Sequence, residues 1–201
     1  MTDKERFIQI LSKVKRNGID RLITWLEEST FFTDPASASY HDNFVGGLCK
    51  HSLDVYDNYV HLTGTDYEDE TAIITCLLHD ICKAGSYKII QKRVKNEETN
   101  KWETANQYGY ADNIFPYGHG EKSVLMINRF IGLTKEEMLM IRWHMGAYES
   151  KECWKDLGDA QKMYKSVMFI HFADMLASKG YVYNKEGYNY NEIQYGQISS
   201  S

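Results

Sequence analysis

The sequence predicts an all-α fold with a small inserted β-hairpin. Apolar residues recur at spacings of three and four along most of the 201 residues, which is the pattern of helices with one buried face. The pattern changes between Ser86 and Tyr108, where two stretches rich in strand-forming residues flank the polar segment Asn96 to Asn100. A hydrophobic content of 43% with 25% charged residues is that of a soluble globular domain.

Two helices are expected ahead of residue 40. Lys4 to Arg16 and Asp20 to Glu28 both carry helically spaced apolar residues, and Asn17-Gly18 breaks the pattern between them. We interpret them as a helical hairpin that, with the loop containing Pro35, forms an N-terminal cap over residues 1–40.

Two central helices follow this cap. Asn43 to Val60 is expected to be helical, and an acidic linker separates it from a second helix over Glu70 to Ile81. In the second helix Asp80 shares an apolar stripe with Ile73 and Leu77. Burying an ionised carboxylate without a partner is prohibitively costly, so Asp80 requires one.

Three more helices are expected after the hairpin insertion, which spans residues 86–108. The segments Gly118 to Ile131 and Asp159 to Ser178 have helical periodicity. Between them, Thr134 and Glu137 have the spacing of a capping box, which opens another helix.

The chain therefore reads as one domain over residues 1–180. The Tyr-rich segment 181–201 has no periodic signal, and it is either an ordered flap or a loose C-terminal tail.

Polar side chains lie on core-facing stripes of several predicted helices. Asp80 is one, Asp174 shares a stripe with Val167, and His119 shares one with Ser123. A pair of divalent cations would give these groups a common partner, because imidazoles and carboxylates are the usual ligands of borderline transition metals. The predicted metal site comprises His51, His79, Asp80, His119, His144 and Asp174.

Charge and segment composition exclude several classes of protein. The net charge of −5 and the lack of a long basic run make an extended nucleic acid an unlikely partner. No secretory leader and no apolar run of membrane-spanning length is present, so we expect a cytoplasmic protein with no membrane partner. The four cysteines have no CxxC spacing, and the oligomeric state stays open.

The sequence contexts of the six residues resemble those of a known superfamily. In chain order they are GGLCKHS, LLHDICK, YGHGEKS, RWHMG and HFADMLAS. This ordered set is similar to that of the HD-domain metal-dependent phosphohydrolases, over roughly Tyr40 to Ser178. Within that superfamily it resembles the six-ligand, two-metal branch, the HD domain of bacterial 3′-5′ exoribonucleases and small stand-alone HD proteins of bacteria and phages.

The resemblance implies an all-α HD-domain fold that holds two divalent metal ions. Iron or manganese is expected, with magnesium, nickel or zinc as alternatives. By carry-over, His51, His79, Asp80 and Asp174 would hold the first metal, while Asp80 bridges to a second one held by His119 and His144. The OB domain that accompanies HD in the exoribonucleases is missing, which favours a small phosphorylated substrate such as a nucleotide.

The reaction that the resemblance implies is phosphoester hydrolysis by a metal-activated hydroxide. Asp80 and Lys83 would be the catalytic residues, and whether the substrate is a monoester or a diester stays open. Lys83 either binds phosphate or complements a helix C-terminus, and the two interpretations weigh equally. Lys122 and Tyr148, close in sequence to predicted ligands, are further candidate substrate contacts.

Two other classes of function compete with hydrolysis. Small HD-fold oxygenases with a mixed-valent di-iron centre share the six-ligand pattern, and ligand identity alone does not decide between water and dioxygen activation. A non-catalytic regulatory or binding module stabilised by metal ranks last, because no ligand is lost.

Three residues near the predicted ligands have two interpretations each. His41 reaches the rim of the site or lies in a surface loop, and the surface loop is favoured. Cys82 packs near the site or adds a soft ligand, and packing is favoured. His171 holds Asp174 or is a satisfied core histidine, and the core role is favoured.

Overall fold

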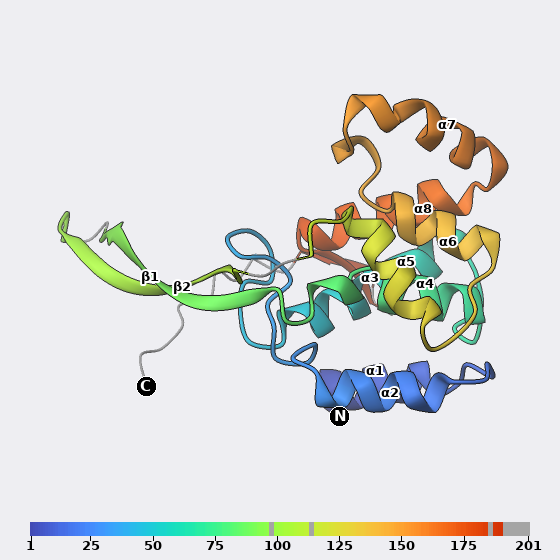
Figure 1. Ribbon diagram of the computed structural model, residues 1–201, viewed down its shortest axis with the longest axis horizontal. Coiled ribbons are helices and arrows are strands. Elements are labelled where there is room, and N and C mark those ends of the chain that lie inside the picture. Colours follow the sequence, from blue (N-terminus) through green and yellow to red (C-terminus); the bar gives the residue numbers. More distant parts are fainter. Residues whose placement is uncertain (97–98, 113–114, 185–186, 191–201) are drawn as a thin grey trace.

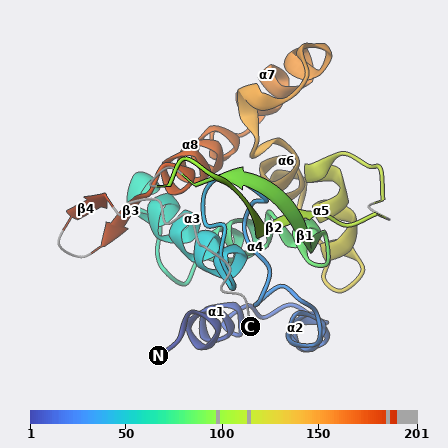
Figure 2. The ribbon, with the colours of Figure 1, turned by 90° about the vertical axis from the view of Figure 1, so that its left-hand side faces the viewer.

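The computed structural model describes residues 1–96, 99–112, 115–184 and 187–190. Its helices lie in layers, as Figure 1 and Figure 2 show: α1 and α2 form one outer layer, α3, α4 and α5 lie in the middle, and α6 and α8 cover the other side. Helix α7 is outermost, beyond α8. The helices run as α1 Asp3–Leu11, α2 Ile19–Glu28, α3 Gly47–Thr63, α4 Glu70–Leu78, α5 His119–Asn128, α6 Lys135–Trp143, α7 Trp154–Met163 and α8 Ser166–Ser178.

The N-terminal helices α1 and α2 bury apolar side chains in the core. Phe7 and Leu11 of α1 and Leu22 and Leu26 of α2 are fully buried. Helix α1 is shorter than predicted, because the chain turns after Leu11 instead of continuing to Arg16. A capping box of Thr2 and Glu5 starts α1.

Helix α3 is the central element and packs against both α4 and α8. It begins after Gly46 and ends at Gly64, both of which have the left-handed backbone that glycine adopts without strain. Helix α4 ends at Leu78, earlier than the predicted Ile81. A separate three-residue 3₁₀ helix, η1 (Ile81–Lys83), follows it, so Asp80 lies in a turn instead of inside a helix.

The later helices differ from prediction in one respect. Thr134 and Glu137 form the predicted capping box at the start of α6, which confirms that assignment. The single helix expected over Asp159 to Ser178 is wrong, because Tyr164 adopts an extended backbone and separates α7 from α8. Two further 3₁₀ helices lie between α6 and α7, namely η2 (Gly146–Tyr148) and η3 (Lys151–Cys153).

A β-hairpin lies where one was expected. Strands β1 (Tyr87–Lys95) and β2 (Trp102–Tyr110) pair antiparallel, from Tyr87 opposite Tyr110 to Lys95 opposite Trp102. The hairpin connects η1 to the segment that leads into α5, and Figure 1 shows it projecting away from the helices.

The all-α fold class is wrong, and the structure is a mixed α and β fold that is mostly helical. In addition to β1 and β2, the segment expected to be a flap or tail contains strands β3 (Tyr181–Asn184) and β4 (Gly187–Tyr190), which pair antiparallel. The amide of Asn58 on α3 donates to the carbonyl of Tyr181 and accepts from the backbone N–H of Tyr183, so β3 is held against α3. Residues 191–201 of the predicted tail lie outside the described residues.

Within the described ranges, no helix has the length and apolar character needed to cross a membrane.

Candidate metal centre

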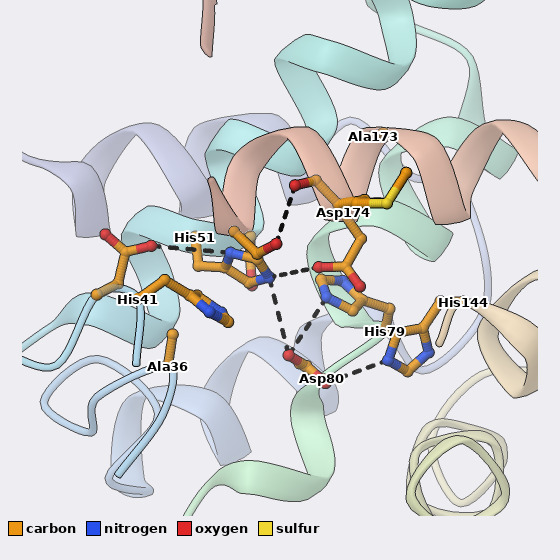
Figure 3. Close-up of polar contacts among 12 residues, drawn as sticks. Ala36, His41, His51, His79, Asp80, His144, Ala173 and Asp174 are labelled. Atoms are coloured by element: carbon orange, nitrogen blue, oxygen red, sulfur yellow. Dashed lines mark hydrogen bonds and ion pairs between the residues drawn. The ribbon is translucent and has the colours of Figure 1, made fainter. Parts of the chain in front are cut away.

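Three of the six predicted ligands lie on helices, and the other three lie in turns that follow helices. His51 lies on α3 and Asp174 on α8, while His119 is the first residue of α5. His79 and His144 directly follow the last residues of α4 and α6, and Asp80 follows His79. Figure 3 shows His51, His79, Asp80, His144 and Asp174 facing one another between these helices.

Five of the six form two overlapping groups that can hold a metal ion. His51, His79 and Asp174 offer ligand atoms that all lie within 4.8 Å of one another, and so do His79, Asp80 and His144. Both groups consist of imidazole nitrogen and carboxylate oxygen, the donor set of borderline divalent metals. The structure therefore supports a metal site here, and it does not define the identity of the metal.

Asp80 is the polar residue at the middle of the cluster. Its Oδ1 lies 2.5 Å from His119 Nε2 and 3.5 Å from His144 Nε2. Its Oδ2 lies 2.6 Å from the Lys83 ammonium and 3.3 Å from His79 Nε2. The two oxygens thus face different sets of side chains. His119 touches Asp80 but belongs to neither of the two groups found among the described residues.

Several buried imidazole nitrogens have no hydrogen-bond partner in the described part of the chain. Among the predicted ligands they are both ring nitrogens of His51 and the Nε2 atoms of His79 and His144, and the neighbouring His41 adds its own Nε2. His51 Nε2 lies 3.0 Å from Asp174 Oδ1, but the orientation is not that of a hydrogen bond. Buried polar atoms in native proteins are usually satisfied, so this concentration at one point fits a site for metal ions.

The way α4 and α6 end orients two of the ligands. His79 Nδ1 donates to the carbonyl of Cys76 at 2.8 Å, and His144 Nδ1 donates to the carbonyl of Ile141 at 2.7 Å. Carbonyls in the last turn of a helix have no partner within the helix, so each imidazole satisfies one of them. The proton on Nδ1 leaves the Nε2 lone pair free and aimed at the centre, which is the arrangement of metal-bound histidine.

The carboxylates of the cluster favour positive charge on their neighbours. Burial opposes ionisation of Asp80, but Lys83, His79 and His119 outweigh it and hold the pKa of Asp80 well below its usual value. Burial lowers the pKa of His119, but Asp80 more than reverses this and raises it to about 10. In Asp174, burial is likewise outweighed, by the contact with His51, and its pKa is lowered. A centre that draws positive charge to itself is electrostatically suited to a cation.

The predicted substrate contacts lie at different depths. Lys83 lies beside Asp80 with an 18% exposed side chain, and Asp80 outweighs burial and raises its pKa. Lys122 is half-buried on α5 and makes no ion pair with any residue that the structure describes. Tyr148, in η2, is 71% exposed.

Sequence reasoning undervalued two residues next to the ligands. The favoured surface-loop interpretation of His41 is wrong, because its ring packs on His51 with centroids 4.7 Å apart and burial lowers its pKa to about 3. Cys82 Sγ lies 3.0 Å from His119 Nδ1, so the thiol does more than pack. The adjacency of Cys82 to the His79-Asp80 pair was a usable signal, whereas His41 lies in a loop without periodicity.

His171 does not hold Asp174 through a hydrogen bond that the structure records. Its Nδ1 donates to the carbonyl of His144 at 2.8 Å, so its role is that of a satisfied histidine in the core packing. Gly146 makes this contact possible, because a Cβ there would lie 2.4 Å from His171 Nε2.

Comparison with protein-family models, curated proteins and solved structures finds no match.

Proposed function

We propose that the protein is a two-metal phosphohydrolase of the HD-domain type that acts on a nucleotide or a related small phosphoester. The observation that carries the proposal is the cluster of buried imidazole nitrogens without partners around Asp80. The ordered motifs that contain these residues add support, because they have the spacing and residue types of the HD superfamily.

The residues of the cluster divide into two sets of ligands. His51, His79 and Asp174 would hold one metal, His119 and His144 a second, and Asp80 would bridge them. When bound, two divalent ions such as iron or manganese would supply Lewis acidity to a phosphoryl group and make a bound water acidic. The orphaned nitrogens of His51, His79 and His144 fit this role, since each needs a partner.

Lys83 supplies the fixed positive charge of the site. Its ammonium lies 2.6 Å from Asp80 Oδ2, and its pKa is raised, so it stays charged at neutral pH. A phosphoester substrate is anionic, and a charged donor at this position would pair with a phosphoryl or leaving-group oxygen. Asp80, His79 and His144 beside it are buried, which limits the access of water that would screen this charge.

The test combines metal analysis with a substrate screen. Protein purified without oxygen is assayed for metal content, and phosphate release from nucleotides and phosphodiesters is then measured with added Mn²⁺ or Fe²⁺. About two metals per chain are expected, with release from one class of substrate. Asp80→Asn should lose both metal and activity, whereas Lys88→Ala, which removes an exposed ion pair with Asp112, should lose neither.

Two results would overturn the proposal. Protein without metal, even after incubation with Mn²⁺ or Fe²⁺, would remove its basis. Two irons per chain with no phosphate release, together with dioxygen consumption in the presence of a small metabolite, would identify the centre as an oxygenase.

A further inference from the structure

Building on the proposed phosphohydrolase function, we propose that His41 is a substrate-contacting residue whose Nε2 hydrogen-bonds a phosphoryl oxygen held at the metal centre. None of the predicted ligand sets includes His41. Within the described residues it also belongs to neither group that can hold a metal ion.

The position of His41 places it beside the ligands without making it one of them. Its ring lies against the ring of His51, with centroids 4.7 Å apart and planes inclined by 42°. Figure 3 shows it on the same side of His51 as Asp80. Its Nε2 is buried and has no hydrogen-bond partner in the described residues. A buried imidazole nitrogen of this kind needs a partner, and the substrate is the partner that the proposed function supplies.

The loop before α3 is built to hold this ring in place. Ser37 Oγ donates to the carbonyl of His41 at 2.9 Å, and the backbone N–H of Ala36 donates to the carbonyl of Asp42 at 3.1 Å. The Tyr87 hydroxyl at the base of β1 donates to the carbonyl of Ala36 at 3.2 Å, which ties the loop to the hairpin.

The backbone next to His41 is also strained and tightly packed. Asp42 has a φ of +46°, a conformation that is uncommon for residues other than glycine. A Cβ at Gly47 would lie 1.9 Å from the Asp42 carbonyl, so only glycine allows this approach. Backbone strain that the surroundings maintain is concentrated at functional sites in proteins. It is independent evidence that the placement of His41 matters.

A neutral imidazole suits the contact that we assign. With the proton on Nε2 it donates one hydrogen bond to a phosphoryl oxygen and adds no charge to a site that already holds Lys83. It would fix the orientation of the phosphoryl group relative to the ligands on α3 and α8.

Two substitutions distinguish the hydrogen bond from Nε2 of His41 from the packing of its ring. His41→Phe keeps an aromatic ring against His51 and removes the donor, whereas His41→Gln keeps an amide donor near the position of Nε2. His61→Phe is the matched control, because His61 is exposed near the end of α3 and stacks on Tyr183 away from the centre. Each protein is loaded with Mn²⁺ and measured for metal content, for binding of inorganic phosphate by calorimetry, and for kcat/KM on the substrate that the screen identifies.

We expect His41→Phe to retain about two metals per chain and to bind inorganic phosphate roughly tenfold more weakly, the effect of one lost hydrogen bond to an anion. The value of kcat/KM should fall at least as much, and His41→Gln should recover part of both losses. If His41→Phe loses metal as Asp80→Asn does, His41 is a ligand and the proposal is wrong. Unchanged phosphate affinity and kcat/KM would also overturn it.

The activity of the wild-type protein shows which of the two proposals has failed, the phosphohydrolase function or the role of His41. Failure of the metal-loaded wild type to release phosphate from any substrate contradicts the phosphohydrolase function itself. Normal wild-type activity with no effect of His41→Phe contradicts only the role of His41. Circular dichroism shows whether His41→Phe folds. If it does not, the His41→Gln protein is compared with the wild type instead. Equal phosphate affinity together with a lower metal content in His41→Gln then overturns the proposal.

Discussion

Each oriented imidazole of the centre uses its second ring nitrogen to fix the direction of the first. His79 and His144 use carbonyls three residues earlier in their own helices. His119 opens α5, so no carbonyl of a preceding turn is available, and its Nδ1 contacts Cys82 Sγ instead. Groups that orient metal ligands in this way usually contribute 10- to 100-fold, roughly, to metal affinity.

If His119 holds a metal ion, as we propose, Cys82 should affect the affinity for that ion. In Cys82→Ala, we expect one of two metal sites to bind Mn²⁺ about tenfold more weakly, because His119 is free to rotate. Cys82→Ser keeps a hydrogen-bonding atom and should lose less. Titration of each apoprotein with Mn²⁺ measures the affinities of the two Cys82 variants. Cys49→Ala is the control for loss of a buried thiol outside the site. Equal affinities in all four proteins would show that the thiol only packs.

Lys83 is the second residue with a testable role. If it contacts the phosphoryl group, Lys83→Ala should lower kcat/KM by tenfold or more, about 1.4 kcal/mol in the barrier, while metal content is kept. If it only complements the short helix η1, turnover should stay nearly unchanged. Steady-state kinetics on the metal-loaded protein distinguish the two outcomes, and Lys88→Ala controls for loss of a surface lysine.

At the scale of residues, the sequence predicted most of the side chains that come together in groups able to hold a metal ion. Asp80 could be recognised because a carboxylate on an apolar stripe demands a partner, and five of the six predicted ligands form the groups that can hold metal. His41 could not be recognised in the same way, because its burial results from a folded loop. The exposure of Tyr148 depends on η2, which has no repeating pattern to reveal it.

At the scale of elements, the most buried ion pair between the N-terminal cap and the later helices is that of Arg16 with Glu137 on α6. The guanidinium of Arg16 makes two hydrogen bonds to the Glu137 carboxylate, at 2.6 and 2.7 Å, and Glu137 is completely buried. Arg16 also donates to the Gly132 carbonyl, and Glu137 belongs to the capping box that starts α6. A two-point contact of this kind fixes both partners in direction as well as distance.

Removing one partner should be strongly destabilising. Arg16→Ala leaves the Glu137 carboxylate buried without a cation, and we expect the free energy of unfolding to fall by about 3 kcal/mol. Lys4→Ala, which removes a pair with Glu27 that is half exposed on both sides, should cost less than about 1 kcal/mol. Urea denaturation measures both variants. Similar losses of unfolding free energy in the two variants would mean that the buried pair stabilises the fold no more than the exposed pair does.

The same pair predicts how stability depends on pH. Burial raises the pKa of Glu137, but the hydrogen bonds from Arg16 and the Thr134 backbone outweigh burial and lower the pKa below its ordinary value. Because the folded-state pKa is the lower one, this contribution is complete above the unfolded-state pKa and is lost as the pH falls through the folded-state pKa. Chemical denaturation should show that the free energy of unfolding of the wild type falls between pH 6 and about pH 3. The fall should be smaller in Glu137→Gln. An identical loss in both proteins would contradict the assignment.

Helix boundaries were predicted less well than helix positions. The capping box at Thr134 is a local chemical signal, and the structure confirms it. Apolar spacing, in contrast, continues past the ends of α4 and α7, because buried turns have the same composition as buried helices. Tyr164 interrupts the expected helix over 159–178 without a glycine or proline to mark the break.

At the scale of the whole molecule, the centre links helices from every layer except the N-terminal cap. Helices α3, α5 and α8 carry predicted ligands, and predicted ligands directly follow α4 and α6. Without metal, buried nitrogens on His51, His79 and His144 have no partner among the described residues. The stability of the folded protein should therefore depend on metal.

Metal removal should lower the melting temperature. A ligand present at 100 times its Kd stabilises the folded state by about 2.7 kcal/mol, so Mn²⁺-loaded protein should melt several degrees above protein treated with a chelator. Differential scanning fluorimetry at fixed protein concentration measures the shift. Asp80→Asn should show no shift, and a wild-type melting temperature indifferent to metal would contradict the metal centre.

The overall fold class could be predicted only in part. The helical majority and the inserted hairpin follow from local periodicity, whereas β3 depends on a contact with Asn58 that is 125 residues away from Tyr183 in the chain. No local pattern contains that information. The all-α prediction failed for this reason, although the predicted metal ligands lie on helices or in the turns that directly follow them.

The order of the ligands along the chain also bears on biosynthesis. His51 lies about a quarter of the way along the sequence, and Asp174 lies on the last described helix, which packs on the helix of His51. A ribosome must therefore release residue 174 from its exit tunnel before the group of His51, His79 and Asp174 can be complete around α3. Nascent chains that stall earlier lack this group, so a metal ion held by it would bind only after α8 has been made.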